Sequence, residues 1–276
     1  MFQPYVLRVS YCIIIVNNLI FNKTFVFILR YIISKTNELN ILNGGKIMIE
    51  IKNVSKSYNG TTKAVDDLNI VIPNGEIIGF LGPNGAGKTT TIKMIAGITK
   101  PDTGSITING INIEEDALGA KRQFGFVPDS PDMFLRLKGI EYLNFMADIY
   151  NVDGETRKQR IRELAERFDM ESVLTDQIQS YSHGMRQKIV IMGVLVHSPS
   201  VWILDEPMTG LDPKSSYLLK EMMREHAESG KTVFFSTHVL EVAEKLCDKV
   251  AIVNKGKLLF YGTMDMVREH FKTDDS

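Results

Sequence analysis

Residues 77–89 of this 276-residue chain read IIGFLGPNGAGKT, and this stretch decides the fold. The short apolar run Ile77–Leu81 predicts a buried strand. The residues after it match the pattern G-x-x-x-x-G-K-[ST] at every fixed position: Gly82, Pro83, Asn84, Gly85, Ala86, Gly87, Lys88 and Thr89. A helix is predicted from about Lys88 to Ala96, ending at Gly97. Strand, glycine-rich loop and helix together form the context that this pattern requires.

The residue types in this loop suit the binding of phosphate. Glycines let backbone N–H groups turn inward and approach phosphate oxygens, and the start of the helix adds partial positive charge. Lys88 is expected to reach the β- and γ-phosphates of a nucleotide, and the hydroxyl of Thr89 is expected to bind Mg²⁺. Thr90, the next residue, completes the predicted nucleotide-binding set. A nucleoside triphosphate such as ATP, together with Mg²⁺, is therefore the expected ligand.

A second apolar run ends in two carboxylates. Residues 201–206 read VWILDE and predict a buried strand with Asp205 and Glu206 at its end. Asp205 is expected to hold the coordination shell of Mg²⁺ through water, as the acidic residue that accompanies such a phosphate-binding loop does. Glu206, one residue further on, is expected to polarise an attacking water. Two solvated acids at a strand end would be the alternative, but the phosphate-binding pattern makes the catalytic interpretation the stronger one.

Composition excludes several classes of protein. Hydrophobic residues make up 44% and charged residues 24% of the chain, as in an ordinary globular protein. The formal net charge of −1 does not favour a nucleic-acid partner. With only Cys12 and Cys247, neither a disulfide framework nor a zinc site built from cysteines is possible, and a reducing compartment is expected.

The first 47 residues differ from the rest. They carry five basic residues against one acidic, whereas residues 48–276 carry 27 against 32. Polar residues interrupt their apolar runs, so no stretch of about 18–20 apolar residues could cross a bilayer, and no signal-peptide cleavage site follows. We expect translation to start at Met48. A membrane-surface anchor and a disordered extension are the alternatives, and the intact mass of the native protein distinguishes them.

Three further segments complete a recognisable order of motifs. Tyr181–Gln187 reads YSHGMRQ, Leu211 and Asp212 follow the two carboxylates, and a predicted strand at Val233–Ser236 leads to His238. From Met48 to the end, the chain resembles the nucleotide-binding subunit of ABC transporters. The resemblance implies an α/β fold: a P-loop NTPase core with a mixed sheet flanked by helices, an antiparallel β region, and a helical subdomain inserted at about residues 130–185.

The resemblance also implies roles for individual residues. Tyr58 matches the aromatic residue that stacks on adenine, although an ordinary strand-end tyrosine is the alternative. Ser182 and Gly184 match the signature that contacts the γ-phosphate bound by the opposite subunit, with Gly184 opening a helix over about 185–196. Asp212 matches the loop that links the two sites across the dimer, and His238 matches the switch histidine at the γ-phosphate.

Two positions depart from the usual family pattern. Asp129 stands where the family usually has Gln, which would bring a carboxylate near Mg²⁺; a simple turn before Pro131 is the alternative. His183 stands where the signature usually has Gly. These variants resemble the ABC-2-type branch, which is associated mainly with export, and they leave the rate and coupling of hydrolysis less certain than ATP binding.

Periodicity predicts the remaining elements. Met48–Val54 alternates as an edge strand, and Val250–Asn254 with Leu258–Tyr261 predicts a hairpin. Helices are predicted over 137–150, 155–168, 214–228 and 239–246. The basic residues between 157 and 167 alternate with acids, which predicts a solvated helix face with i,i+4 pairs. Phe134, Leu135 and Tyr142 are candidates for docking a membrane subunit, with packing inside the subdomain as the alternative for each.

The predicted function is that of the ATP-hydrolysing subunit of an ABC transporter, peripheral on the cytoplasmic face of the membrane. A separate multi-helix permease and a second nucleotide-binding subunit, identical or different, are the expected partners. Two other functions compete: a soluble ATPase of the same type that acts in translation or on DNA, and a binding module without catalysis. The sequence does not name the transported substrate, because selectivity would reside in the permease.

Overall fold

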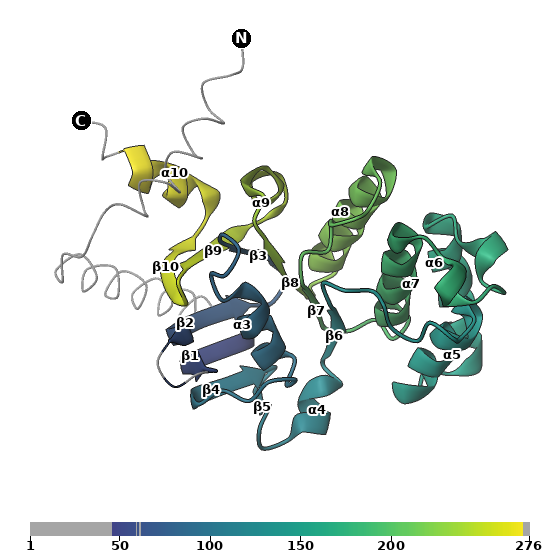
Figure 1. The fold of residues 1–276 in the computed structure, drawn as a ribbon, viewed down its shortest axis with the longest axis horizontal. Helices are drawn as coiled ribbons and strands as arrows, with labels where there is room; N and C mark the ends of the chain where they lie inside the picture. The colour runs from purple at the N-terminus through teal and green to yellow at the C-terminus, as the bar shows by residue number, and fades with distance from the viewer. Residues whose placement is uncertain (1–45, 59, 61, 273–276) are drawn as a thin grey trace, which may run out of the picture.

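The computed structural model describes residues 46–58, 60 and 62–272. The predictions for residues 1–47 therefore fall outside the described part of the chain, apart from Lys46 and Ile47. The described residues form two sheets with helices on both sides of the larger one (Figure 1).

The smaller sheet is antiparallel, in the order β2-β1-β4-β5. Its strands are β1 (Ile47–Ser57), β2 (Lys63–Pro73), β4 (Thr103–Ile108) and β5 (Ile111–Asn112). The prediction of an edge strand at Met48–Val54 is wrong, because β1 pairs with β2 on one side and β4 on the other. The alternation that suggested an edge strand arises because one face of this sheet is buried: Ile49 and Ile51 are buried, whereas Lys52 is exposed.

The larger sheet is mixed, in the order β10-β9-β3-β8-β7-β6. Its strands are β3 (Ile77–Leu81), β6 (Phe124–Val127), β7 (Val201–Leu204), β8 (Thr232–Thr237), β9 (Lys249–Asn254) and β10 (Lys257–Gly262). The first five are parallel, and β10 returns antiparallel to β9 as the predicted hairpin. This arrangement confirms the mixed sheet with an additional antiparallel region.

The helices that the sequence predicted are present, with ends that differ by one or two residues, whereas the helices at Ala117–Lys121 and Met264–Lys272 were not predicted. The helices are α3 (Lys88–Ile95), α4 (Ala117–Lys121), α5 (Gly139–Ile149), α6 (Gly154–Arg167), α7 (His183–Leu195), α8 (Pro213–Glu228), α9 (Leu240–Leu246) and α10 (Met264–Lys272), with short 3₁₀ turns η1 (Glu171–Val173) and η2 (Ile178–Ser180). Helices α5 and α6 lie with α7 at the end of the molecule away from the antiparallel sheet (Figure 1). They fall within the predicted helical subdomain, whose boundaries stay a prediction.

The two faces of the mixed sheet are buried against different partners. Successive side chains of a strand point to opposite faces, so Phe80 and Phe234 join the hydrophobic cluster formed with α3 and the antiparallel sheet. Trp202 and Phe235 instead join the cluster formed with α5, α6, α7 and α8. Burial on both faces explains why these strands are almost continuously apolar in sequence. The carboxyl ends of β3, β7 and β8 therefore stand side by side between two hydrophobic layers.

Candidate active site

The glycine-rich loop connects the end of β3 to the start of α3. Gly87 has φ 102°, and a Cβ atom there would lie 2.4 Å from the carbonyl oxygen of Ala64 at the start of β2. Gly85 has φ 78°, and a Cβ atom there would meet nothing within 4 Å. One glycine thus lets the loop close against the antiparallel sheet, and the other leaves its outer side open. A loop of this shape provides backbone N–H groups for phosphate oxygens.

The side chain of Lys88 folds back over this loop. It is only 6% exposed, and its ammonium donates to the carbonyls of Gly82 at 2.8 Å and Pro83 at 3.2 Å. It also lies 3.4 Å from Oε1 of Glu206. The sequence places Lys88 and Glu206 far apart, and the fold brings them to one ion pair at the sheet edge.

Asp205 follows directly after β7 and is 1% exposed. Its Oδ1 accepts a hydrogen bond from the Ser236 hydroxyl at 2.5 Å, while its buried Oδ2 has no hydrogen-bond partner among the described residues. Burial raises the pKa of Asp205, and the negative charges of Asp129 and Glu206 act in the same direction. The hydroxyls of Ser236 and Thr89 oppose this rise in pKa by favouring the carboxylate.

Glu206 has a left-handed backbone, with φ 46°. Such a conformation is uncommon for a residue other than glycine and turns the chain sharply at the strand end. Its Oε2 lies 3.0 Å from Nδ1 of His238, and its backbone N–H donates to the Ser236 hydroxyl at 2.9 Å. Glu206 thus contacts Lys88 on one side and His238 on the other, which joins the ends of β3, β7 and β8.

Asp129 and Tyr58 lie further out. Asp129 follows β6 and is exposed, yet it is close enough for its charge to act on Asp205. Tyr58 follows β1 and is 60% exposed, with the Lys56 ammonium 5.9 Å from its ring centre. No described contact joins Tyr58 to the glycine-rich loop, so its role at adenine stays a prediction.

The signature-like residues lie at the starts of two helices. Ser182 caps α7 by accepting from the Met185 N–H at 3.2 Å, so the helix begins at His183, earlier than predicted. Asp212 caps α8 by accepting from the Ser215 N–H at 2.9 Å, and its hydrogen bonds to Ser215 lower its pKa to about 2. Neither residue has a described contact with Lys88, Asp205 or Glu206.

Gly184 and Gly210 lie where the start of α7 and the loop before α8 approach each other closely, which leaves no room for larger side chains. A Cβ at Gly184 would lie 3.0 Å from the carbonyl oxygen of Gly210, and a Cβ at Gly210 would lie 2.2 Å from the ring of His183. The imidazole of His183, one of the departures from the family pattern, therefore fits against Gly210 within the same subunit. No described contact joins His183 to Lys88, Asp205 or Glu206.

One site residue escaped the sequence analysis. Ser236 on β8 is fully buried and hydrogen-bonds both Asp205 and the backbone of Glu206. The motif pattern does not include it. A signal was nevertheless present, because it is a hydroxyl directly after the apolar run Val233–Phe235, two residues before His238. Buried hydroxyl groups are hydrogen-bonded in native proteins, so a partner was to be expected.

Comparison with known proteins identifies the family. The family model for ABC transporters matches residues 65–209, which is more than half of the chain. The ABC transporter ATP-binding protein NatA of Bacillus subtilis is 32% identical over 232 residues, covering 83% of this chain and 94% of that protein. The chain belongs to the ABC transporter family.

Two further members extend the comparison. The Nod factor export ATP-binding protein I of Burkholderia lata is 34% identical over 218 residues, covering 78% of this chain and 70% of that protein. The dimeric structure of an ATP-binding cassette in a post-hydrolysis state, bound to ADP and phosphate, is 25% identical with a TM-score of 0.72, covering 79% of this chain and 99% of that chain.

This ABC protein is an ATP-binding and ATP-hydrolysing motor subunit of a transporter, similar to those of the exporter-like ABC-2 branch. The family assignment confirms the transporter interpretation over the non-transport ATPase and the binding module. ABC ATPase subunits dimerise and work with membrane permeases. Among the described residues, no helix has the length and apolar character needed to span a membrane.

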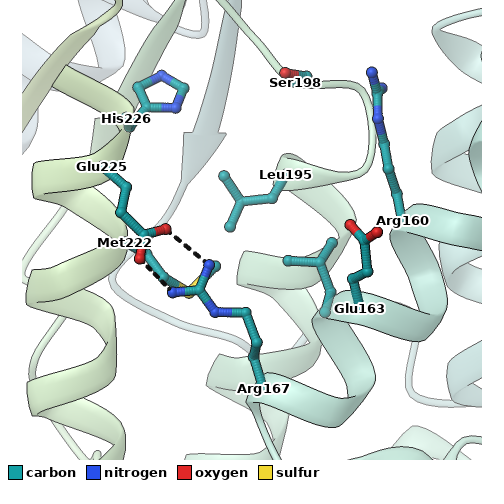
Figure 2. Close-up of a pocket in the computed structure, with 9 residues that line it drawn as sticks. Arg160, Glu163, Arg167, Leu195, Ser198, Met222, Glu225 and His226 are labelled. Atoms are coloured by element: carbon teal, nitrogen blue, oxygen red, sulfur yellow. Dashed lines mark hydrogen bonds and ion pairs between the residues drawn. The ribbon is translucent and has the colours of Figure 1, made fainter. Parts of the chain in front are cut away.

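Two hollows in the described surface differ in their position relative to this site. One of about 210 Å³ lies beside the site, lined by Glu206, His238 and residues of the adjoining loops, β8 and α9. Another of about 270 Å³ lies apart from it, where α6, the end of α7 and α8 meet (Figure 2). We call this second region the α6–α8 junction; it is lined by Arg160, Glu163, Leu164, Arg167, Leu195, Ser198, Met222, Glu225 and His226.

Proposed function

We propose that this ABC subunit binds Mg²⁺-ATP on the loop from Gly82 to Thr90 and hydrolyses it with Glu206 as the general base. The observation that carries the proposal is the convergence of Lys88, Glu206 and His238, with Glu206 lying 3.4 Å from the Lys88 ammonium and 3.0 Å from the His238 ring. Glu206 would accept a proton from the water that attacks the γ-phosphate. Lys88 and His238 would balance the charge of the phosphate oxygens.

The residues beside the loop fit a magnesium ion. The Oδ2 atom of Asp205 is buried without a hydrogen-bond partner in the described chain, and the Thr89 hydroxyl lies near this carboxylate. A carboxylate and a hydroxyl are the oxygen donors that Mg²⁺ takes from a protein when it also binds phosphates. Thr89 and Asp205 would hold the ion, with Asp129 near its outer shell. The ion would supply charge compensation at the β- and γ-phosphates.

We further propose that hydrolysis takes place between two nucleotide-binding subunits, identical or different. Ser182 and Gly184 lie in the first turn region of α7, where backbone N–H groups and the helix dipole favour a phosphate. They have no described contact with Lys88 of the same chain, so a second subunit would bring them to the nucleotide. Asp212 would lie in the loop between the two sites, and Tyr58 would stack on adenine. The relative bound to ADP and phosphate is dimeric.

The permease would dock near the aromatic residues that follow Asp129, on the cytoplasmic face of the membrane. Of the three docking candidates, Tyr142 is 2% exposed and Leu135 packs against the core, so both serve packing. Phe134 is 44% exposed, and its ring lies 5.6 Å from that of Phe145, which is 42% exposed. These two rings form the exposed apolar surface that a membrane subunit would cover.

The substitution Glu206→Gln tests the proposed chemistry. Because the amide cannot accept the proton, we expect hydrolysis to fall by roughly 10²–10⁴-fold while ATP still binds. Phosphate release and nucleotide affinity are measured on the full chain, with Glu166→Gln on the exposed face of α6 as the control. Near-normal turnover in Glu206→Gln would remove Glu206 from the role.

A further inference from the structure

Ser236 is a buried polar residue of β8, the central strand of the active site. Strand β8 lies between β3, which leads into the glycine-rich loop, and β7, which leads into Asp205. Ser236 pairs with Phe80 of β3 in the parallel register and is 0% exposed. A hydroxyl in such a place costs free energy unless both its proton and its lone pairs find partners.

Both capacities of this hydroxyl are used at the active site. The hydroxyl donates a hydrogen bond to Oδ1 of Asp205 at 2.5 Å, and it accepts a hydrogen bond from the backbone N–H of Glu206 at 2.9 Å. A serine hydroxyl has one proton to donate, so the two bonds define its orientation. One oxygen atom thus links the side chain of the first carboxylate to the backbone of the second.

The two bonds have different geometric consequences. Engaging Oδ1 of Asp205 leaves Oδ2 as the oxygen without a hydrogen-bond partner in the described chain, so Oδ2 is the atom that would be available to a magnesium ion. Anchoring the N–H of Glu206 holds a residue whose φ is 46°, and this sharp turn directs its carboxylate to Lys88 and His238. Removing the hydroxyl would release both residues at the same time.

We propose that Ser236 is a positioning residue that sets the metal-binding carboxylate of Asp205 and the catalytic carboxylate of Glu206 through a single hydroxyl. The inference rests on the proposed roles of these two acids. Ser236 acts through these two residues, which it contacts directly. Loss of its hydroxyl should therefore change both the Mg²⁺ concentration that the enzyme needs and its rate of hydrolysis.

The test compares Ser236→Ala with a matched variant on the same strand. Thr232 is equally buried, at the other end of β8, and its hydroxyl donates to the carbonyl of Pro73 at 3.1 Å. Thr232→Val therefore removes a buried hydroxyl from β8 without touching the site. The purified full chain is assayed for kcat, for KM of ATP, for the Mg²⁺ concentration that half-saturates the binding of a fluorescent ATP analogue, and for thermal unfolding.

For Ser236→Ala we expect kcat to fall by about 10–100-fold, because small displacements of catalytic groups have effects of that size. The half-saturating Mg²⁺ concentration should rise about 10-fold, as for the loss of an outer partner of a metal ligand. Binding of the analogue without Mg²⁺ should stay within about twofold, since the loop is unchanged. Ser236→Thr, which keeps the hydroxyl, should recover part of both losses, and Thr232→Val should match the wild type.

Three results would overturn the inference. Ser236→Ala could keep the wild-type kcat and Mg²⁺ dependence, Thr232→Val could lose as much activity, or Ser236→Ala could weaken Mg²⁺-free binding as strongly as it lowers kcat, which would indicate a general structural role. If Ser236→Thr does not fold, the comparison of Ser236→Ala with Thr232→Val still decides. Failure of the proposed function is separate, because it would appear as normal turnover in Glu206→Gln.

Discussion

Two clusters of charged side chains in this protein differ in almost every physical respect. At the active site, Lys88 at the start of α3 and Asp205 directly after β7 are 6% and 1% exposed. At the α6–α8 junction, Arg167 forms two hydrogen bonds of 2.8 Å with Glu225, but the two side chains are 36% and 57% exposed (Figure 2). Charges cost much more to bury than to leave in water. The buried cluster is therefore where single substitutions should have large effects on function, and the exposed one is where they should have small effects on stability.

The largest expected effect in this comparison comes from Lys88→Ala. The ammonium is the one buried cation beside the glycine-rich loop in the described chain, and charged hydrogen bonds to phosphate are strong. We expect ATP to bind about 100-fold more weakly, or about 3 kcal/mol, as measured by titration calorimetry. Lys93→Ala, in the last turn of the same helix, is the control. Unchanged affinity in Lys88→Ala would contradict the assignment of the loop.

An intermediate effect is expected from His226, which lines the junction and packs edge-on against Trp202 at 5.7 Å. Burial lowers its pKa to about 4, and the positive charge of Lys231 acts in the same direction. Below pH 6.5 the unfolded chain therefore binds a proton that the folded chain excludes, so stability should fall as the pH drops from about 6.5 to 4.

The substitution His226→Phe removes the imidazole that takes up this proton, while an aromatic ring can still pack against Trp202. We expect it to reduce the loss of unfolding free energy between pH 6.5 and 4 by about 2 kcal/mol. Urea unfolding at several pH values measures the difference, and ATP affinity at pH 7 should stay unchanged. The same pH slope in variant and wild type would show that the buried imidazole is not responsible.

The smallest effect is expected from the exposed ion pair itself. A double-mutant cycle with Arg167→Gln and Glu225→Gln should give a coupling energy of about 0.2–1 kcal/mol, because solvent screens exposed pairs. The coupling should decrease further in high salt. A value of several kcal/mol would mean that the junction resembles the active site more closely than its exposure indicates.

The contrast also explains what the sequence could predict. Residues 77–89 and 201–206 each combine a buried strand with the chemistry at its end, so local pattern was enough to place Lys88, Asp205 and Glu206. By contrast, Arg167 was assigned to a solvated helix face with i,i+4 pairs. The helix carrying Arg167 does contain an internal pair, Lys158 with Glu155, but Arg167 pairs across to α8. Contacts between distant exposed residues follow from packing of helices, which local periodicity does not determine.

Met48–Val54 was wrongly predicted to be an edge strand, again because local periodicity does not determine which elements pair. Its alternation records which face is buried, and this part of the prediction agrees with the structure. Whether a strand lies at an edge depends on its partners, which here are β2 and β4. Ser236 shows the converse case. Its burial was predictable from the apolar strand around it, but the identity of its hydrogen-bond partners required the order β3-β8-β7.

That strand order has a consequence for the making of the protein. The glycine-rich loop leaves the ribosome well before β8, the neighbouring strand that completes the site. Pairing of strands so distant in sequence is a slow step in folding. A nascent chain that has exposed only its first two hundred residues carries the phosphate loop without Asp205, Glu206, Ser236 or His238. ATP turnover can therefore begin only after β8 and His238 have been synthesised.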